Sequence, residues 1–180
     1  MKARIEIALC AAALGLAVAV GAPESLALPK EGALAPNARL ENADGNTLQM
    51  KVWKGKPILI VYEDKDSASQ NTILKDELSK LAKGDRYKAT VALAAVADVS
   101  SYDFWPVKGF VKDAIRDESK KAGTTIYCDW TGAFRDAYQI KRGSSTVILV
   151  GKDGRVLFAA QGTVPAAGRT KLLTLLRSQL

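Results

Sequence analysis

Runs and alternations of apolar residues predict the strands of this chain. Residues 38–42 and 47–50 alternate across Asp44-Gly45-Asn46, a pattern typical of a β-hairpin. Residues 58–62 form an unbroken apolar run rich in β-branched residues, which indicates a central strand buried on both faces. Further strands are expected at residues 87–97, 124–128, 146–150 and 155–160.

Helical periodicity alternates with these strands. After Asp66-Ser67, Leu74, Leu78 and Leu81 recur at helical spacing, and Gly84 ends the predicted helix. Further helices are expected at residues 109–121 and 133–138, and from Pro165 onward. Strands separated by helices imply parallel pairs, whereas the closing hairpin implies an antiparallel edge. The pattern therefore predicts one α/β domain with a mixed sheet and helices on both faces.

The first 27 residues have the layout of a secretory signal peptide. Lys2 and Arg4 precede an uncharged run over residues 7–22, and small residues stand at the two positions of Ser25-Leu26-Ala27 that a signal peptidase reads. The run falls short of the ~20 apolar residues that a spanning helix needs, which makes an uncleaved anchor the alternative. We expect a mature domain of residues 28–180 in the periplasm, with the extracellular space as the alternative.

Cysteine and histidine content excludes much of common enzyme chemistry. The chain has no histidine, which removes His-based acid/base catalysis, Ser-His-Asp triads and the usual zinc sites. Of its two cysteines, Cys10 falls within the predicted signal peptide. The mature domain would therefore keep Cys128 alone and form no intramolecular disulfide.

The net charge of +7 says little about partners by itself. Basic residues are interleaved with acidic ones, as in Lys112-Asp113, which is typical of an ordinary solvated surface. Export makes nucleic acid an unsuitable partner, and peripheral contact with an anionic membrane is the remaining electrostatic alternative.

Three segments match known sequence motifs in the right order. Residues 44–64 contain a DG-type hairpin before a Gly-Lys-Pro strand, residues 126–140 contain D-x-x-G followed by A-Y-x-I, and residues 142–162 form a closing K-D-G hairpin. Together these segments resemble the thioredoxin-like superfamily, in its redoxin and peroxiredoxin branch. The resemblance implies a thioredoxin-like three-layer fold: a mixed central sheet with an N-terminal β-hairpin and helices on both faces.

Within that superfamily the chain most resembles the periplasmic YtfJ-type proteins. The matching features are Ser67-Ala68 after the first buried strand, Asp85-Arg86-Tyr87, and the segments at residues 136–140 and 152–156. That family is poorly characterised, so the resemblance implies little about activity.

The resemblance also locates a redox site whose chemistry this chain lacks. Thioredoxin chemistry needs a thiolate at a helix N-terminus and a resolving thiol three residues later. Aligning the first buried strand puts Ser67 at the first cysteine position and Gln70 near the second. A serine there is expected to cap the helix, but it does not exchange with a disulfide.

The proline that faces this pair in the fold is replaced as well. Its position holds Ser145, and we expect a trans bond before it, because a non-proline cis bond costs ~3 kcal/mol. The site is thus predicted to be degenerate, and the sequence assigns neither a catalytic residue nor a cofactor.

Cys128 is the remaining candidate nucleophile. It follows a predicted strand at the edge where open α/β sheets bind ligands. The carboxylate of Asp129 beside it is expected to disfavour the thiolate, which favours a buried and inert cysteine. A one-cysteine redox site and an intermolecular disulfide are the alternatives.

Two other groups of residues are candidates for a site, one for a metal ion and one for a binding groove. Glu63, Asp64 and Asp66 follow the central strand, but the spacing from Asp64 lacks the glycine and the final glutamate of a calcium loop, so no metal site is expected. The aromatic residues are candidates for a binding groove or for packing at the rim of the core: Trp53, Tyr62, Tyr102, Trp105 and Trp130. Those within residues 100–106 lie in a predicted loop, where recognition is common.

The sequence thus favours an exported thioredoxin-fold protein that binds a protein or peptide partner without catalysis. The alternative is an enzyme, a redoxin-like thiol antioxidant or oxidoreductase that uses Cys128 alone. Neither the partner nor the oligomeric state follows from the sequence.

Overall fold

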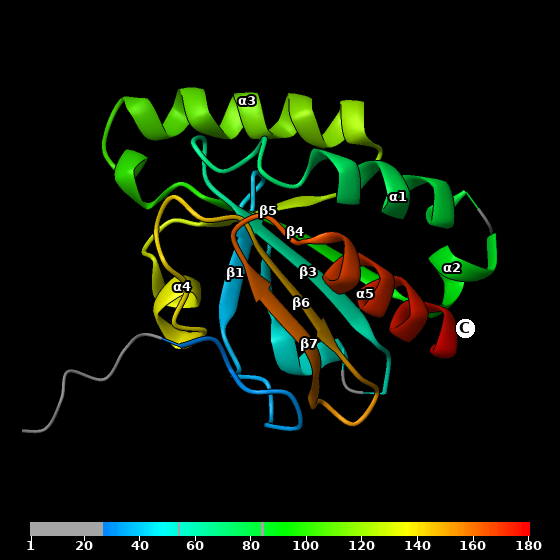
Figure 1. Ribbon diagram of the computed structural model, residues 1–180. Coiled ribbons are helices and arrows are strands. Elements are labelled where there is room, and N and C mark those ends of the chain that lie inside the picture. Colours follow the sequence, from blue (N-terminus) through cyan, green and yellow to red (C-terminus); the bar gives the residue numbers. More distant parts are fainter. Residues whose placement is uncertain (1–26, 54, 84) are drawn as a thin grey trace, which may run out of the picture.

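The computed structural model describes residues 27–53, 55–83 and 85–180 (Figure 1). The predicted signal peptide therefore lies, except for Ala27, outside the described residues, as does Gly84. No described helix is long and apolar enough to cross a membrane. The elements, in chain order, are β1 (Arg39–Asn42), β2 (Thr47–Gln49), the short 3-10 helix η1 (Met50–Trp53), β3 (Ile58–Glu63), α1 (Thr72–Ala82), α2 (Asp85–Thr90), β4 (Ala92–Asp98), the 3-10 helix η2 (Ser100–Tyr102), α3 (Val107–Ala122), β5 (Ile126–Asp129), α4 (Ala133–Ala137), β6 (Thr146–Val150), β7 (Val156–Gln161) and α5 (Ala166–Ser178).

The strands form a single mixed sheet in the order β2-β1-β5-β4-β3-β6-β7. β3, β4 and β5 are parallel, as expected of strands joined through helices. β6 runs antiparallel to β3 and pairs with β7 as a hairpin, while the β1–β2 hairpin joins the other side of the sheet through β5. The α/β fold with an N-terminal hairpin and a mixed sheet is confirmed.

The central strand β3 is buried on both faces, which explains its unbroken apolar sequence. Ile58 and Ile60 point to one core, together with Phe134 and Tyr138 of the α4 region. Leu59 points to the opposite core, which α1, α2 and α5 cover with residues such as Leu74 and Leu172. The sheet therefore carries an apolar layer on each side. Figure 1 shows the helices around the sheet.

The predicted strand over residues 87–97 is wrong in its first half. Asp85–Thr90 forms α2, and β4 begins only at Ala92. The helical turn buries Tyr87, leaving 6% of it exposed against the core under α1 and α5, whereas a longer strand would have carried this ring past the end of β3. Tertiary packing has overridden the β-propensity of Tyr87, Thr90 and Val91.

The helix expected directly after Asp66-Ser67 starts later than predicted. α1 begins at Thr72, and the residues before it form tight turns. The later helices agree with prediction, and Gly123 ends α3 in the left-handed conformation with φ of 63°.

Candidate functional site

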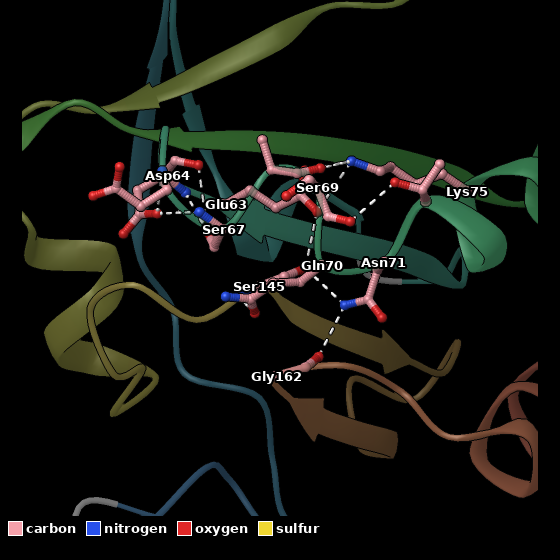
Figure 2. A network of polar contacts seen from close by, with 12 residues as sticks. Glu63, Asp64, Ser67, Ser69, Gln70, Asn71, Lys75, Ser145 and Gly162 are labelled. Atoms are coloured by element: carbon pink, nitrogen blue, oxygen red, sulfur yellow. Dashed lines mark hydrogen bonds and ion pairs between the residues drawn. The ribbon is translucent and has the colours of Figure 1, made fainter.

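The residues at the three positions predicted for a degenerate redox site lie together where β3 ends and β6 begins (Figure 2). Because β6 is antiparallel to β3, its first residue lies beside the last residues of β3. Ser67 and Gln70 belong to the turns after β3, and Ser145 immediately precedes β6. Neither serine is exposed to solvent.

Ser67 closes a turn with Asp64 and does not cap a helix, which corrects the sequence-based expectation. The backbone N–H of Asp64 donates to Ser67 Oγ at 2.9 Å, and Asp64 Oδ1 accepts from the N–H of Ser67 at 2.8 Å and from that of Asp66 at 3.1 Å. The N–H groups that open α1 lie beyond this turn, at residue 72 and later. The hydroxyl of Ser67 is thus bound to local backbone.

Asp64 also ties this turn to the chain before β6. Its Oδ2 atom accepts from the N–H of Gly143 at 2.7 Å. Partial burial raises the pKa of Asp64, but hydrogen bonds from Ser67, Gly143 and Asp66 outweigh that effect and hold the pKa below its usual value. The carboxylate is therefore ionised and engaged at neutral pH, and it is unsuited to act as a general base.

The side chain of Gln70 forms hydrogen bonds with the main chain of the segment that precedes β6. Its Nε2 donates to the carbonyl of Gly143 at 2.8 Å, and its Oε1 accepts from the N–H of Ser145 at 3.0 Å. An extended peptide adding to a sheet uses alternate N–H and carbonyl groups of this kind. The side chain of Gln70 thus already hydrogen-bonds the two backbone groups that such a peptide would need.

Asn71 is the buried centre of the network, and sequence analysis missed it. Its Nδ2 donates to Ser145 Oγ and to the carbonyl of Gly162, both at 2.9 Å, and its Oδ1 accepts from the N–H of Val164 at 2.8 Å. Its side chain makes no capping bond to α1. The available signal was its spacing, because Asn71 shares the buried face of the helix with Leu74 and Leu78.

Glu63 completes the network from the end of β3. Ser145 Oγ donates to Glu63 Oε1 at 2.9 Å, and Lys75 Nζ lies 3.0 Å from Glu63 Oε2. Lys75 also donates to the carbonyl of Ala68. Every polar side chain of this cluster thus has a partner, as buried polar groups require.

The network contains neither a thiol nor an activated hydroxyl. Within the described residues the one cis peptide bond joins Trp105 and Pro106, so the bond before Ser145 is trans. No three His, Cys, Asp or Glu side chains within the described residues are placed to hold a metal ion. A hollow of about 170 Å³ lies beside the network, lined by polar residues that include Asp98 and Arg142.

A second polar cluster, also missed in the sequence, lies at the ends of β4 and β5. The Arg135 guanidinium lies 3.1 Å from Asp98, with both side chains largely buried. Tyr62 donates to Asp129 Oδ2 at 3.1 Å, and burial together with this carboxylate raises the pKa of the phenol well above its ordinary value. These contacts are mutually satisfied and hold α4 to the sheet edge.

Cys128 lies apart from Ser67, Gln70 and Ser145, on β5 beneath α3. It packs with Val99 and Trp130 and is 2% exposed. Burial raises the pKa of the thiol to about 11, with a smaller contribution from Glu41, which is opposite Cys128 in the β1–β5 register. The sequence-based prediction that Asp129 disfavours the thiolate is wrong, because burial and Glu41 raise this pKa. The carboxylate of Asp129 instead accepts hydrogen bonds from Tyr62 and from the N–H of Arg135.

The aromatic residues considered for one groove are dispersed. Tyr62 belongs to the core below the sheet, and Trp130 is 6% exposed beneath Lys108, whose Nζ lies 4.7 Å from the ring centroid. The side chain of Trp53 lies outside the described part of the chain. Trp105, by contrast, is 90% exposed. Phe104, directly before it, is 55% exposed, and Phe110, five residues after it, is 72% exposed.

Comparison with known proteins places the fold within a family. The model of the family described as "Bacterial protein of unknown function (YtfJ_HI0045)" matches residues 48–179. No curated protein matches the sequence. The resemblance to YtfJ-type proteins is confirmed.

Solved structures of redox proteins share the fold at low identity. A candidate thiol:disulfide interchange protein DsbE from Chlorobium tepidum is 20% identical with a TM-score of 0.60, over 82% of this chain and 99% of that one. Thiol peroxidase from Chromobacterium violaceum is 14% identical with a TM-score of 0.61, over 84% and 88%. The exposed lipoprotein thioredoxin Etrx1 from Streptococcus pneumoniae is 17% identical with a TM-score of 0.55, over 79% and 98%. These likenesses confirm the thioredoxin-like fold and leave the activity open.

Replacement of Asn71 is expected to destabilise the fold. Asn71→Ala leaves the N–H of Val164, the carbonyl of Gly162 and one bond of Ser145 without their partner, and we expect a loss of about 3 kcal/mol in the free energy of unfolding. Urea denaturation measures this, with Asn46→Ala at an exposed turn position as the matched control. An Asn71→Ala loss below about 0.5 kcal/mol contradicts the assignment.

Cys128 is expected to resist alkylation in the folded protein. The shift of its pKa from 9.0 to about 11 lowers the thiolate fraction at pH 8 roughly 100-fold, and burial slows the reaction further. The native rate should still rise toward pH 11, whereas the unfolded rate should level off near its ordinary pKa of 9.0. Mass spectrometry of the Cys128 peptide, with and without denaturant, measures both rates.

The control for this experiment is an exposed cysteine introduced by Thr163→Cys, which should react equally fast in both conditions. If Cys128 reacts as fast in the folded protein as in denaturant, the thiol is accessible and the antioxidant alternative gains support.

Proposed function

We propose that this chain, which belongs to the YtfJ_HI0045 family of bacterial proteins of unknown function, is an exported, non-catalytic thioredoxin-fold protein that binds a protein partner. One observation carries the proposal. At the edge where relatives of this fold place a cysteine pair, this chain has hydroxyl and amide side chains bonded to one another and to the backbone. These groups stabilise the loops and do not exchange electrons.

The chemistry of disulfide exchange supports this conclusion. Exchange requires a thiolate that attacks a disulfide and a second thiol that resolves the mixed product. Ser67 and Gln70 supply neither, and Cys128 is buried with a raised pKa beneath α3. The antioxidant alternative would therefore have to depend on a thiol that is both shielded and mostly protonated.

The closed loop before β6 argues against peptide binding in the usual manner of the fold. Gln70 already occupies the carbonyl of Gly143 and the N–H of Ser145. A partner that added a strand here would have to displace both hydrogen bonds. We therefore assign the partner surface elsewhere and prefer a folded protein partner to an extended peptide.

The aromatic patch, defined as Phe104, Trp105 and Phe110, is the surface that we assign to the partner. Its three large rings are more than half exposed within seven residues of sequence. Exposed aromatic clusters are typical of interaction sites, and Trp is enriched among residues that dominate binding energy. Lys108 anchors the surrounding loop through Asp103, at 2.6 Å, and through the ring of Trp130. The rings are thus presented from a held segment.

The first test is enzymatic. The purified protein is expected to accelerate neither the reduction of insulin disulfides by dithiothreitol nor the consumption of peroxide over the rates in buffer alone. The reason is that no accessible thiolate exists at the sheet edge. A Cys128→Ser variant is expected to behave identically in both assays. Clear activity in either assay that disappears in Cys128→Ser overturns the non-catalytic assignment.

The second arm tests the aromatic patch. Chemical cross-linking in cells that produce the protein should join it to a defined partner, and Trp105→Ser with Phe110→Ser should abolish that product. These residues are exposed, so folding should change by less than about 0.5 kcal/mol each. Leu34→Ser, at a position 66% exposed, is the matched control and should keep the product. Loss with Leu34→Ser, or persistence in the double variant, contradicts the assigned surface.

A further inference from the structure

An open apolar groove of about 1310 Å³ lies between α1 and α3, on one face of the sheet. Its floor consists of Val61 on β3 and Leu93 and Ala95 on β4, which lie on the same face by strand register. α1 contributes Leu78 to one wall, and α3 contributes Ile115 to the other. Both helices lie over this face of the sheet in Figure 1. The volume exceeds the ~300–1,000 Å³ typical of small-molecule sites.

The groove is unusual because it lies over the middle of the sheet. β4 is the fourth of seven strands, yet Leu93 is 40% exposed. None of the described side chains of α3 is buried, although Val111 and Ile115 face the sheet. The walls carry small residues, Ala82 and Ala114 among them, which do not fill the space. Protein interiors are normally close-packed, so this apolar floor is suited to an apolar ligand.

The charges that line the groove favour an anionic ligand. Each of the four carboxylates there is already engaged by a partner: Glu63 by Lys75, Asp64 by backbone N–H groups, Asp98 by Arg135 and Glu118 by Lys121. Lys56, Lys65 and Lys83 also line the groove and form no ion pair with any side chain that the structure describes. Among the described side chains of the groove, the charge left without a partner is therefore positive.

Two of these lysines lie at one end of the groove. Lys56 precedes β3, and Lys83 follows the last residue of α1. From that end the floor follows β4, whose seven residues extend roughly 23 Å at ~3.3 Å per residue. A single extended acyl chain with an anionic head at the lysine end matches both features.

We propose that this groove binds a free single-chain anionic amphiphile of the fatty-acid type. The acyl chain lies on Leu93 and Ala95 between the two helices, and the carboxylate lies near Lys56 and Lys83. A bilayer cannot present a surface to a floor that lies between helices, so the ligand enters as a monomer. This inference does not depend on the proposed partner or on the aromatic patch.

The first described residue, Ala27, is not positioned near the groove. The N–H of Ala27 donates to Gln139 Oε1, next to α4, which covers the opposite face of the sheet. The ligand is therefore assigned to a separate molecule.

Calorimetric titration of the purified, delipidated protein with laurate and myristate, both below their micelle concentrations, tests the proposal. We expect one chain per protein and about fourfold tighter binding per added methylene, hence roughly 16-fold from laurate to myristate. Ala114→Trp places an indole in the groove from an exposed helix position and should weaken myristate binding at least 10-fold. Ala167→Trp, at an exposed position of α5, is the matched control and should bind like the unchanged protein.

A second pair of measurements tests the head group without placing a bulky side chain in the groove. Lys56→Ala with Lys83→Ala should weaken laurate about 10-fold or more but leave dodecanol, which has no charge, within twofold. Binding to anionic phosphatidylglycerol vesicles free of fatty acid, if there is any, should be the same for the unchanged protein and for Ala114→Trp. Absence of laurate and myristate binding, equal binding by Ala114→Trp, or binding to vesicles alone overturns the proposal.

Discussion

The need to pair buried polar groups determines how this fold closes at the end of its central strand. Asn71 lies with 3% of its surface exposed at the start of α1, where its amide reaches Ser145, Gly162 and Val164. Those contacts join α1 to the start of β6 and to the chain between β7 and α5. An unpaired amide there would cost about 1–3 kcal/mol for each buried partner left without a bond. The local arrangement of Ser67, Gln70 and Glu63 is consistent with this requirement.

The same requirement separates this chain from the redox proteins whose fold it shares. A reactive thiolate needs free N–H groups at a helix start and access to its target. Here the side chains of the turn from Asp64 to Asn71 bond to one another's backbone and to the chain around β6, and α1 begins beyond the turn. In our proposal this edge of the sheet therefore stabilises the fold and carries no redox chemistry. The two surfaces that we propose for binding lie on and around α3, where Phe110 is exposed and Ile115 lines the groove.

Most of the fold could be predicted from the sequence, because each buried strand carries its own apolar pattern. Residues 58–62 are all apolar or aromatic, so a central strand buried on both faces is the arrangement that removes them from water. Gly123, with its positive φ, marks the end of α3. α2 could not be recognised, because Tyr87 and Thr90 favour a strand locally and only contact with the core under α1 and α5 makes the turn favourable. The start of α1 was misplaced for a similar reason: the hydroxyl of Ser67 has backbone partners nearer than the helix.

The candidate site was partly predictable, in that alignment brought attention to Ser67, Gln70 and Ser145, which do lie together. Their bonding was not predictable, since it depends on Asn71 and Gly143, whose partners are 73 or more residues away in sequence. The most direct test of this hydrogen-bond network is the exchange rate of the Ser145 amide hydrogen, measured by NMR. The account predicts slow exchange that Gln70→Ala accelerates at Ser145 without lowering overall stability by more than about 1 kcal/mol. Rapid exchange in the unchanged protein, equal to that of an exposed loop amide, would contradict it.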